Sequence, residues 1–109
     1  MTAKDKRKHQ RIPALNLSYI CLDENNKIVK QGMGRTLNIS ESGILLETNL
    51  PIKLEYLVQL TIALEEDLLE MNGKPIHVQS RNTGKFEVGI EFLEPDPECI
   101  RRLESFINK

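Results

Sequence analysis

Long apolar runs, paired cysteines and aromatic side chains are all scarce in this sequence of 109 residues. No run of about 18 apolar residues is present, so we expect no transmembrane helix, and the N-terminus is too polar for a secretory signal peptide. The two cysteines, Cys21 and Cys99, lie far apart and form no CxxC motif and no metal-ligand pattern. These features favour reduced thiols, no metal site, no membrane insertion and a cytoplasmic location.

Charge is unevenly distributed along the chain. The first eleven residues contain five basic residues and one acidic residue, a balance of +4, whereas the whole chain carries −1 and the remainder therefore −5. Nonspecific nucleic-acid binding needs an extended positive surface, and single-strand-binding barrels use exposed aromatic residues, which make up only 5% of this chain. We therefore expect neither DNA nor RNA as a partner, while a local anionic ligand remains compatible with the basic N-terminus.

The apolar pattern predicts a mainly β domain. Hydrophobic residues make up 39% and charged residues 28% of the chain, which is typical of a folded domain with one core. Alternating apolar and polar residues predict six strands, at 15–21, 27–37, 43–48, 56–64, 75–81 and 85–93. The acidic run Glu65-Glu66-Asp67 is expected in a loop, and Asn82-Thr83-Gly84 in a hairpin loop where Gly84 takes a positive φ.

A C-terminal helix is predicted at about 96–108. Asp96 can cap it, Pro97 suits its first position, and apolar residues then recur at helical spacing, at Ile100, Leu103, Phe106 and Ile107. Together these patterns predict a small six-stranded antiparallel β-barrel over residues 13–109, with the helix covering an open end. Residues 1–12 are expected to form a flexible basic arm.

The arm carries the first functional motif. The segment Arg7-Lys8-His9-Gln10-Arg11 places two guanidinium groups four residues apart, and Pro13 disfavours a helix just before it. A guanidinium group can pair bidentately with phosphate oxygens or with guanine O6 and N7, and it can stack on a purine. Basic N-terminal runs are more often solvated tails, so this motif alone is a weak signal.

The second motif is the polar turn Asn38-Ile39-Ser40-Glu41-Ser42-Gly43. The Asn38 amide oxygen can accept from guanine N1–H or N2–H2, and the Ser40 hydroxyl can donate to a phosphate or a base. Gly43 is expected to let the turn adopt a conformation closed to other residues and to let a flat base approach the backbone. These residue types are also ordinary in turns, so the motif gains specificity only in combination with the arginines.

The combination of RxxxR and NxSxxG resembles the signature of the PilZ family of cyclic di-GMP receptors. The resemblance covers nearly the whole chain, including 11–13, 34–37, 43–48, 88–92 and the terminal helix. It implies a bacterial six-stranded barrel that binds this second messenger on its outside. Arg7 and Arg11 would contact phosphates and guanine edges, and Asn38, Ser40 and Gly43 would line the guanine site. Many members carry aspartate in place of the asparagine.

Lys6 and Lys8 are secondary candidates for ligand binding. Members of the family look able to bind one cyclic di-GMP or a stacked pair, and extra cations at the arm would help to neutralise the second ligand. Solvated lysines are the alternative, and the ligand stoichiometry stays open.

Enzyme functions find little support in the sequence. His9 and His77 have no cysteine, serine or carboxylate partner at a spacing typical of a catalytic triad or metal site, and the glycines form no GxGxxG motif. We expect a receptor without catalytic residues or a cofactor, in which cyclic di-GMP orders the arm and thereby signals to an effector protein of unknown identity. The alternative is a PilZ-fold adaptor that binds proteins and no nucleotide.

Overall fold

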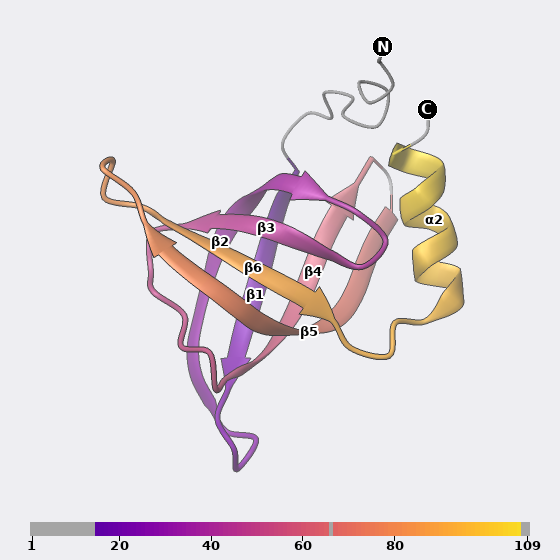
Figure 1. Ribbon diagram of the computed structural model, residues 1–109. Helices are drawn as coiled ribbons and strands as arrows, with labels where there is room; N and C mark the ends of the chain where they lie inside the picture. Colours follow the sequence, from indigo (N-terminus) through magenta and orange to yellow (C-terminus); the bar gives the residue numbers. More distant parts are fainter. Residues whose placement is uncertain (1–14, 66, 108–109) are drawn as a thin grey trace.

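The computed structural model describes residues 15–65 and 67–107, which form a closed six-stranded antiparallel barrel followed by a helix (Figure 1). This architecture confirms the predicted fold class. Around the barrel the strands follow the order β1-β2-β3-β6-β5-β4, and β1 pairs with β4 to close the ring. Their bounds are β1 (Asn16–Leu22), β2 (Ile28–Ile39), β3 (Gly43–Thr48), β4 (Leu57–Leu64), β5 (Asp67–Ser80) and β6 (Phe86–Phe92). The predicted arm, residues 1–12, lies outside the described residues.

Side chains of alternate residues fill the barrel. On β4 the apolar face predicted from the sequence is buried, from Val58 through Leu60 and Ile62 to Leu64. Tyr19 also points inward, and its hydroxyl lies 2.7 Å from the Thr48 hydroxyl, which satisfies both polar groups inside the core. The barrel wall therefore has an apolar inner side and an outer side of mixed polar and apolar residues on which a ligand site can form.

β5 is longer than the sequence pattern predicts. The structure begins this strand at Asp67, which the sequence analysis assigned to a loop, and continues it to Ser80. The inward positions Leu69 and Met71 are buried, but Asn72-Gly73 resembles a turn and hides the alternation in the sequence. The first half of β5 pairs with β4 and the second half with β6, so this one strand serves both halves of the barrel.

The C-terminal helix α2 (Pro97–Ile107) lies against the barrel next to β5 (Figure 1). The Asp96 carboxylate accepts a hydrogen bond from the Glu98 backbone N–H at 2.9 Å, which confirms the predicted cap. Leu103 is fully buried in the barrel core, and Arg102 forms an ion pair with Asp67 of β5 at 3.3 Å. The apolar stripe thus attaches the helix to the barrel.

Candidate functional site

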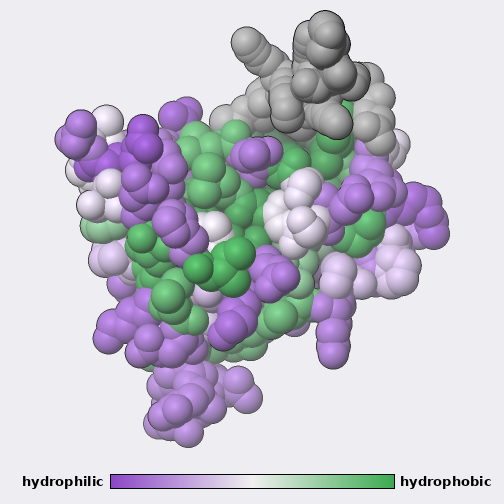
Figure 2. Space-filling view, in the orientation of Figure 1, coloured by the Kyte–Doolittle hydropathy of each residue, from purple (hydrophilic) through white to green (hydrophobic). Residues whose placement is uncertain are grey.

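A hollow on the outside of the barrel surrounds the β2–β3 turn. Its volume is about 400 Å³, and its walls combine the turn with outward-facing residues of β3, β5 and β6. On this side of the molecule hydrophobic surface is interspersed with hydrophilic residues (Figure 2). The hollow is lined by Asn38, Ile39, Ser40, Ser42, Gly43, Ile44, Leu45, Ile76, Gly89, Ile90 and Glu91. The three motif residues predicted from the sequence in the described part of the chain therefore lie together.

A β-bulge in β2 turns Asn38 toward the hollow. β2 pairs with β3 through Thr36 opposite Leu46 and Asn38 opposite Leu45, so Leu37 is an extra residue between them. Thr36 is buried, whereas Asn38 is exposed. Without the bulge, the period of two would place both side chains on the inner face. The bulge is therefore the local reason that Asn38 is available to a ligand.

The turn itself is held by its serines. The Ser40 backbone N–H donates to the Gly43 carbonyl oxygen at 2.9 Å, and the Ser40 and Ser42 hydroxyl oxygens lie 3.1 Å apart. The Ser42 carbonyl oxygen accepts from the Phe92 N–H at 2.9 Å, which connects the turn to β6. Ser42, which was not predicted as a site residue, thus adds a second hydroxyl beside Ser40.

Gly43 has a structural role that differs from the predicted one. Its φ does not lie in the left-handed region, so the expectation of a turn conformation closed to other residues is wrong. Instead, β3 and β6 approach so closely here that a Cβ on Gly43 would collide with the Ile90 carbonyl oxygen. The glycine permits the strand contact that forms one edge of the hollow.

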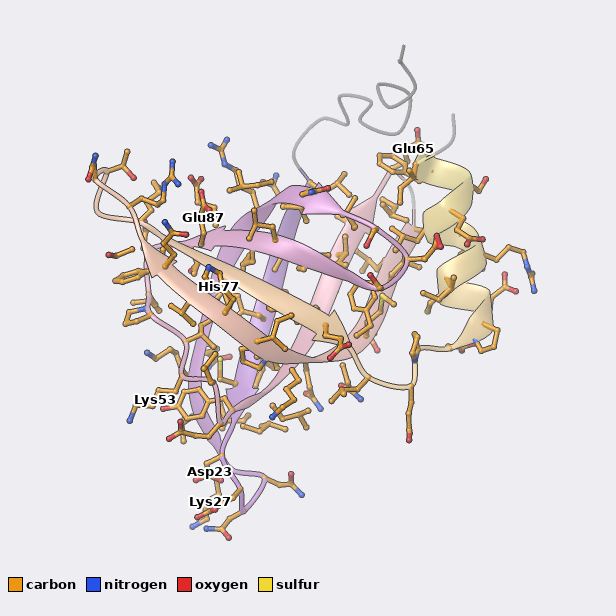
Figure 3. All side chains as sticks on the ribbon, in the orientation of Figure 1. Asp23, Lys27, Lys53, Glu65, His77 and Glu87 are labelled. Carbon is orange, nitrogen blue, oxygen red and sulfur yellow. The ribbon has the colours of Figure 1, made fainter. Side chains whose placement is uncertain are left out.

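Further lining residues come from strands that are distant in the sequence. Leu45 of β3 pairs with Gly89 of β6, and both line the hollow. Gly89 pairs in turn with His77 of β5, whose exposed side chain is a neighbour of the hollow rather than one of its lining residues (Figure 3). Glu91 pairs with Gly43 at the rim. The sequence gives no signal for this group as a set, because its members meet only through the order of strands in the barrel.

The positions of the predicted arginines cannot be compared with the hollow, since Arg7, Arg11, Lys6 and Lys8 lie outside the described residues. The described chain begins at Leu15. Its backbone N–H donates to the Thr36 hydroxyl at 3.0 Å, and its carbonyl oxygen accepts from the Thr36 N–H at 2.9 Å. The chain therefore enters β1 beside the part of β2 that carries Asn38.

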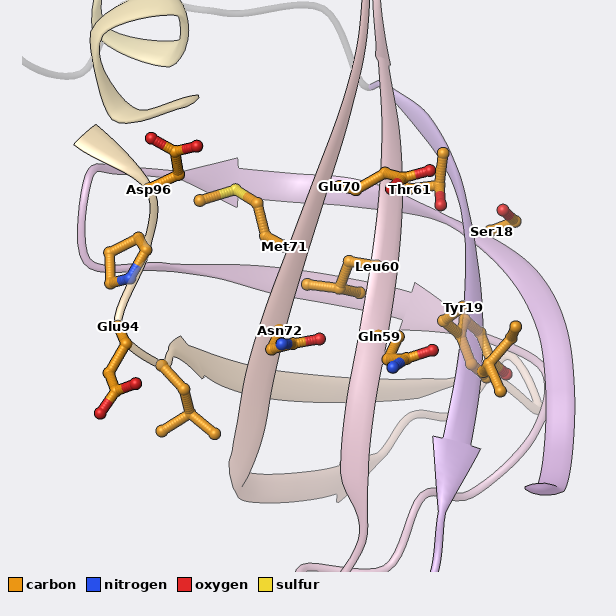
Figure 4. A pocket seen from close by; sticks show the side chains of 13 residues that line it. Ser18, Tyr19, Gln59, Leu60, Thr61, Glu70, Met71, Asn72, Glu94 and Asp96 are labelled. Atoms are coloured by element: carbon orange, nitrogen blue, oxygen red, sulfur yellow. The ribbon is translucent and has the colours of Figure 1, made fainter. Parts of the chain in front are cut away.

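A second hollow, of about 470 Å³, lies outside β1, β4 and β5, beside the connection between β6 and α2 (Figure 4). Its carboxylates are Glu70, Glu94 and Asp96, and none of the described residues that line it is a lysine or arginine. Carboxylates repel phosphate groups, and three of them line this hollow, whereas Glu91 is the one carboxylate among the described residues that line the hollow at the turn. The second hollow therefore suits an anionic nucleotide less well, despite its larger volume. The hollow at the β2–β3 turn is the better candidate.

Residues 15–65 and 67–107 contain neither a candidate metal site nor a helix suited to span a membrane. Within these ranges no group of three or more histidine, cysteine, aspartate or glutamate side chains is arranged to hold a metal ion. No helix in the same part of the chain has the length and apolar character needed to cross a membrane.

The family model described as PilZ domain matches residues 5–109, which include both sequence motifs. No curated protein matches the chain.

Proposed function

Because the chain belongs to the PilZ domain family, whose members generally bind cyclic di-GMP, we propose that it is a cyclic di-GMP receptor. The observation that carries the proposal is the β2 bulge, which turns Asn38 outward into a hollow beside Ser40, Ser42 and Gly43. These groups supply an amide, two hydroxyls and accessible backbone on one side of the barrel. They suit the base edge and phosphodiester of a guanine nucleotide.

Each motif residue has a proposed role. The Asn38 amide oxygen accepts from guanine N1–H or N2–H2, and the Ser40 hydroxyl donates to a phosphate or a base acceptor. Arg7 and Arg11 pair with phosphates and with the O6 and N7 edge of guanine. Asn38 accepts less strongly than aspartate would, but it adds no charge that repels the phosphates.

Lys6 and Lys8 are proposed as secondary contacts. Their ammonium groups would neutralise phosphates of a second, stacked cyclic di-GMP if two molecules bind. The stoichiometry of the titration described below decides whether this role exists.

Cyclic di-GMP would signal to an effector protein by ordering the N-terminal segment, residues 1–12. Ligand contacts to Arg7 and Arg11 would favour one arrangement of residues 1–12 on the barrel, and an effector protein that prefers this arrangement would bind more tightly. PilZ domains are ligand-binding domains rather than enzymes. We accordingly assign no catalytic residue, and we propose that the protein acts in the bacterial cytoplasm.

Isothermal titration of the full chain with cyclic di-GMP tests the proposal. We expect saturable binding by the wild type, no binding of GTP, and at least about tenfold weaker binding after Arg7→Ala or Arg11→Ala, since each change removes a charge-assisted pair. Arg101→Ala is the matched control, because this exposed arginine pairs with Glu98 within α2. Absence of heat and of competition at high ligand concentration would overturn the proposal and favour an adaptor that binds only proteins.

A further inference from the structure

Gly89 of β6, one of the strand residues that line the hollow at the β2–β3 turn, has no side chain. It lies between Leu45 of β3 and His77 of β5. A Cβ on Gly89 would meet the His77 Cβ at 3.6 Å and Ile76 Cγ1 at 3.7 Å, both ordinary van der Waals contacts, and its φ is not left-handed. Unlike Gly43, this glycine is therefore required neither by the backbone conformation nor by strand packing. A strand glycine without such a reason often marks the close approach of a ligand.

A second bulge brings Ile76 to the wall of the same hollow. The register between β5 and β6 shifts between Pro75 and His77, so Ile76 is the extra residue. Proline within a sheet is found at such irregularities, and a bulge re-aims the neighbouring side chain. Pro75 is buried, whereas Ile76 is 57% exposed and lines the hollow. Two bulges on different strands thus turn Asn38 and Ile76 toward one space.

The hollow therefore has an apolar side and a polar side. Leu45 and Ile76 provide aliphatic surface. Gly89 lies on β6, between the strands that carry these two residues, and adds no side chain. Asn38, which pairs with Leu45 across β2 and β3, and the turn serines provide donors and acceptors on the side of the hollow away from β5. A purine base has the same two aspects, because its faces are apolar while its edge carries the hydrogen-bonding groups.

We propose that one base of cyclic di-GMP lies flat over Gly89, against Leu45 and Ile76, while its edge reaches Asn38. Gly89 and Ile76 are thereby assigned as ligand-contacting residues in addition to the two sequence motifs. This assignment rests on the function proposed above. The base occupies the space that the missing side chain at position 89 leaves open. Burial of the exposed surface of Ile76 against the base contributes favourably to the binding free energy.

Gly89→Leu tests the need for open space. The change fills the hollow from a position where the strand tolerates a Cβ, so we expect at least about hundredfold weaker binding of cyclic di-GMP by calorimetry, with no fall in the thermal unfolding midpoint. Ala63→Leu is the matched control, since it adds a large side chain to an exposed position of β4 outside the hollow. We expect this control to bind like the wild type.

Ile76→Ala tests the wall without adding bulk. Removing the aliphatic contact should weaken binding about fivefold to tenfold, because the lost methyl and methylene groups no longer cover the base. Leu68→Ala is its control, since Leu68 is 67% exposed on β5 and does not line the hollow. Ile76 is exposed, so its replacement should leave the unfolding midpoint unchanged.

The outcomes separate this inference from the proposed function. Binding by the wild type with unchanged affinity in Gly89→Leu, or in Ile76→Ala, would overturn the placement of the base while leaving the receptor function intact. If Gly89→Leu lowers the unfolding midpoint, the result for Ile76→Ala decides. Absence of binding by the wild type would overturn the receptor function and this inference with it.

Discussion

Thr36 and Asn38 lie two residues apart on β2 and face opposite sides of the barrel wall, because Leu37 is an extra residue between them. Thr36 points into the barrel and binds the backbone of Leu15, where the described chain begins. Asn38 points outward into the hollow. One short stretch of β2 therefore binds the backbone of Leu15 through Thr36 and carries Asn38, whose amide is proposed to bind the base.

Asn38→Ala should weaken cyclic di-GMP binding about tenfold, because a base N–H loses its acceptor while the rest of the hollow is preserved. Asn38→Asp should stay within about threefold of the wild type, since stronger acceptance from guanine offsets repulsion by the phosphates. Calorimetric titration measures both. Asn72→Ala, at an exposed position of β5 in the acidic hollow, is the control. Equal affinities of Asn38→Ala and the wild type would refute the role given to this amide.

Gly43→Ala should destabilise the barrel by about 1–3 kcal/mol, because its Cβ would collide with the Ile90 carbonyl oxygen and force β3 away from β6. Gly89→Ala is the matched control, since its Cβ would make only ordinary contacts. Urea unfolding gives both free energies. A Gly43→Ala protein as stable as the wild type would contradict the structural role assigned to this glycine.

Stability should fall at alkaline pH because two ionisable groups are buried in their neutral forms. Burial raises the pKa of Tyr19 above its ordinary value of 10.0, while the hydrogen bond between Tyr19 and Thr48 opposes this rise. Burial likewise raises the pKa of Cys21 above its ordinary value of 9.0. The stability that the two buried groups contribute is fully present while the pH is below their ordinary pKa values. This stability is lost as the pH rises from the ordinary pKa values through the higher pKa values of the folded state. In this range the unfolded chain releases protons that the folded chain retains.

Tyr19→Phe separates the two contributions. At about pH 8 the variant should be less stable than the wild type by about 1 kcal/mol, because the buried hydrogen bond between the Tyr19 and Thr48 hydroxyls is lost. Between about pH 8 and about pH 10.5 the wild type should lose more stability than the variant, which has no phenol to ionise. Urea unfolding at both pH values measures the difference. Parallel losses in the two proteins would argue against a raised Tyr19 pKa.

Leu103→Ala should cost about 2–5 kcal/mol, since this side chain is fully buried where α2 meets the barrel. Arg102→Ala, which removes the ion pair with Asp67, should cost less than about 1 kcal/mol because both side chains are about half exposed. Thermal or urea unfolding compares the two variants. Similar losses from both changes would mean that charge rather than apolar burial attaches the helix.

Local features of the fold were predictable from the sequence. Asp96 caps the helix through a neighbouring N–H, and Gly84 has a φ of 85° in its hairpin loop, both as predicted. Such features depend on a few consecutive residues, and the alternation of apolar residues likewise indicates the barrel. The start of β5 was not predictable, because Asn72-Gly73 inside the strand resembles a turn.

The candidate site was predictable only in part. Asn38, Ser40 and Gly43 stand out as a motif, but the outward direction of Asn38 depends on the extra residue Leu37, which no alternation pattern reveals. Gly89 and Ile76 join the site through strand pairings between distant parts of the chain. Their contribution follows from the closed barrel and its bulges, and neither can be read from local sequence.

The most direct test of the central claim is a titration of isotopically labelled protein with cyclic di-GMP, followed through backbone amide resonances. We expect the largest shifts at Asn38, Ser40, Ser42 and Gly43, and none at the acidic hollow around Glu70. Unshifted resonances at saturating ligand, or shifts confined to the acidic hollow, would contradict it.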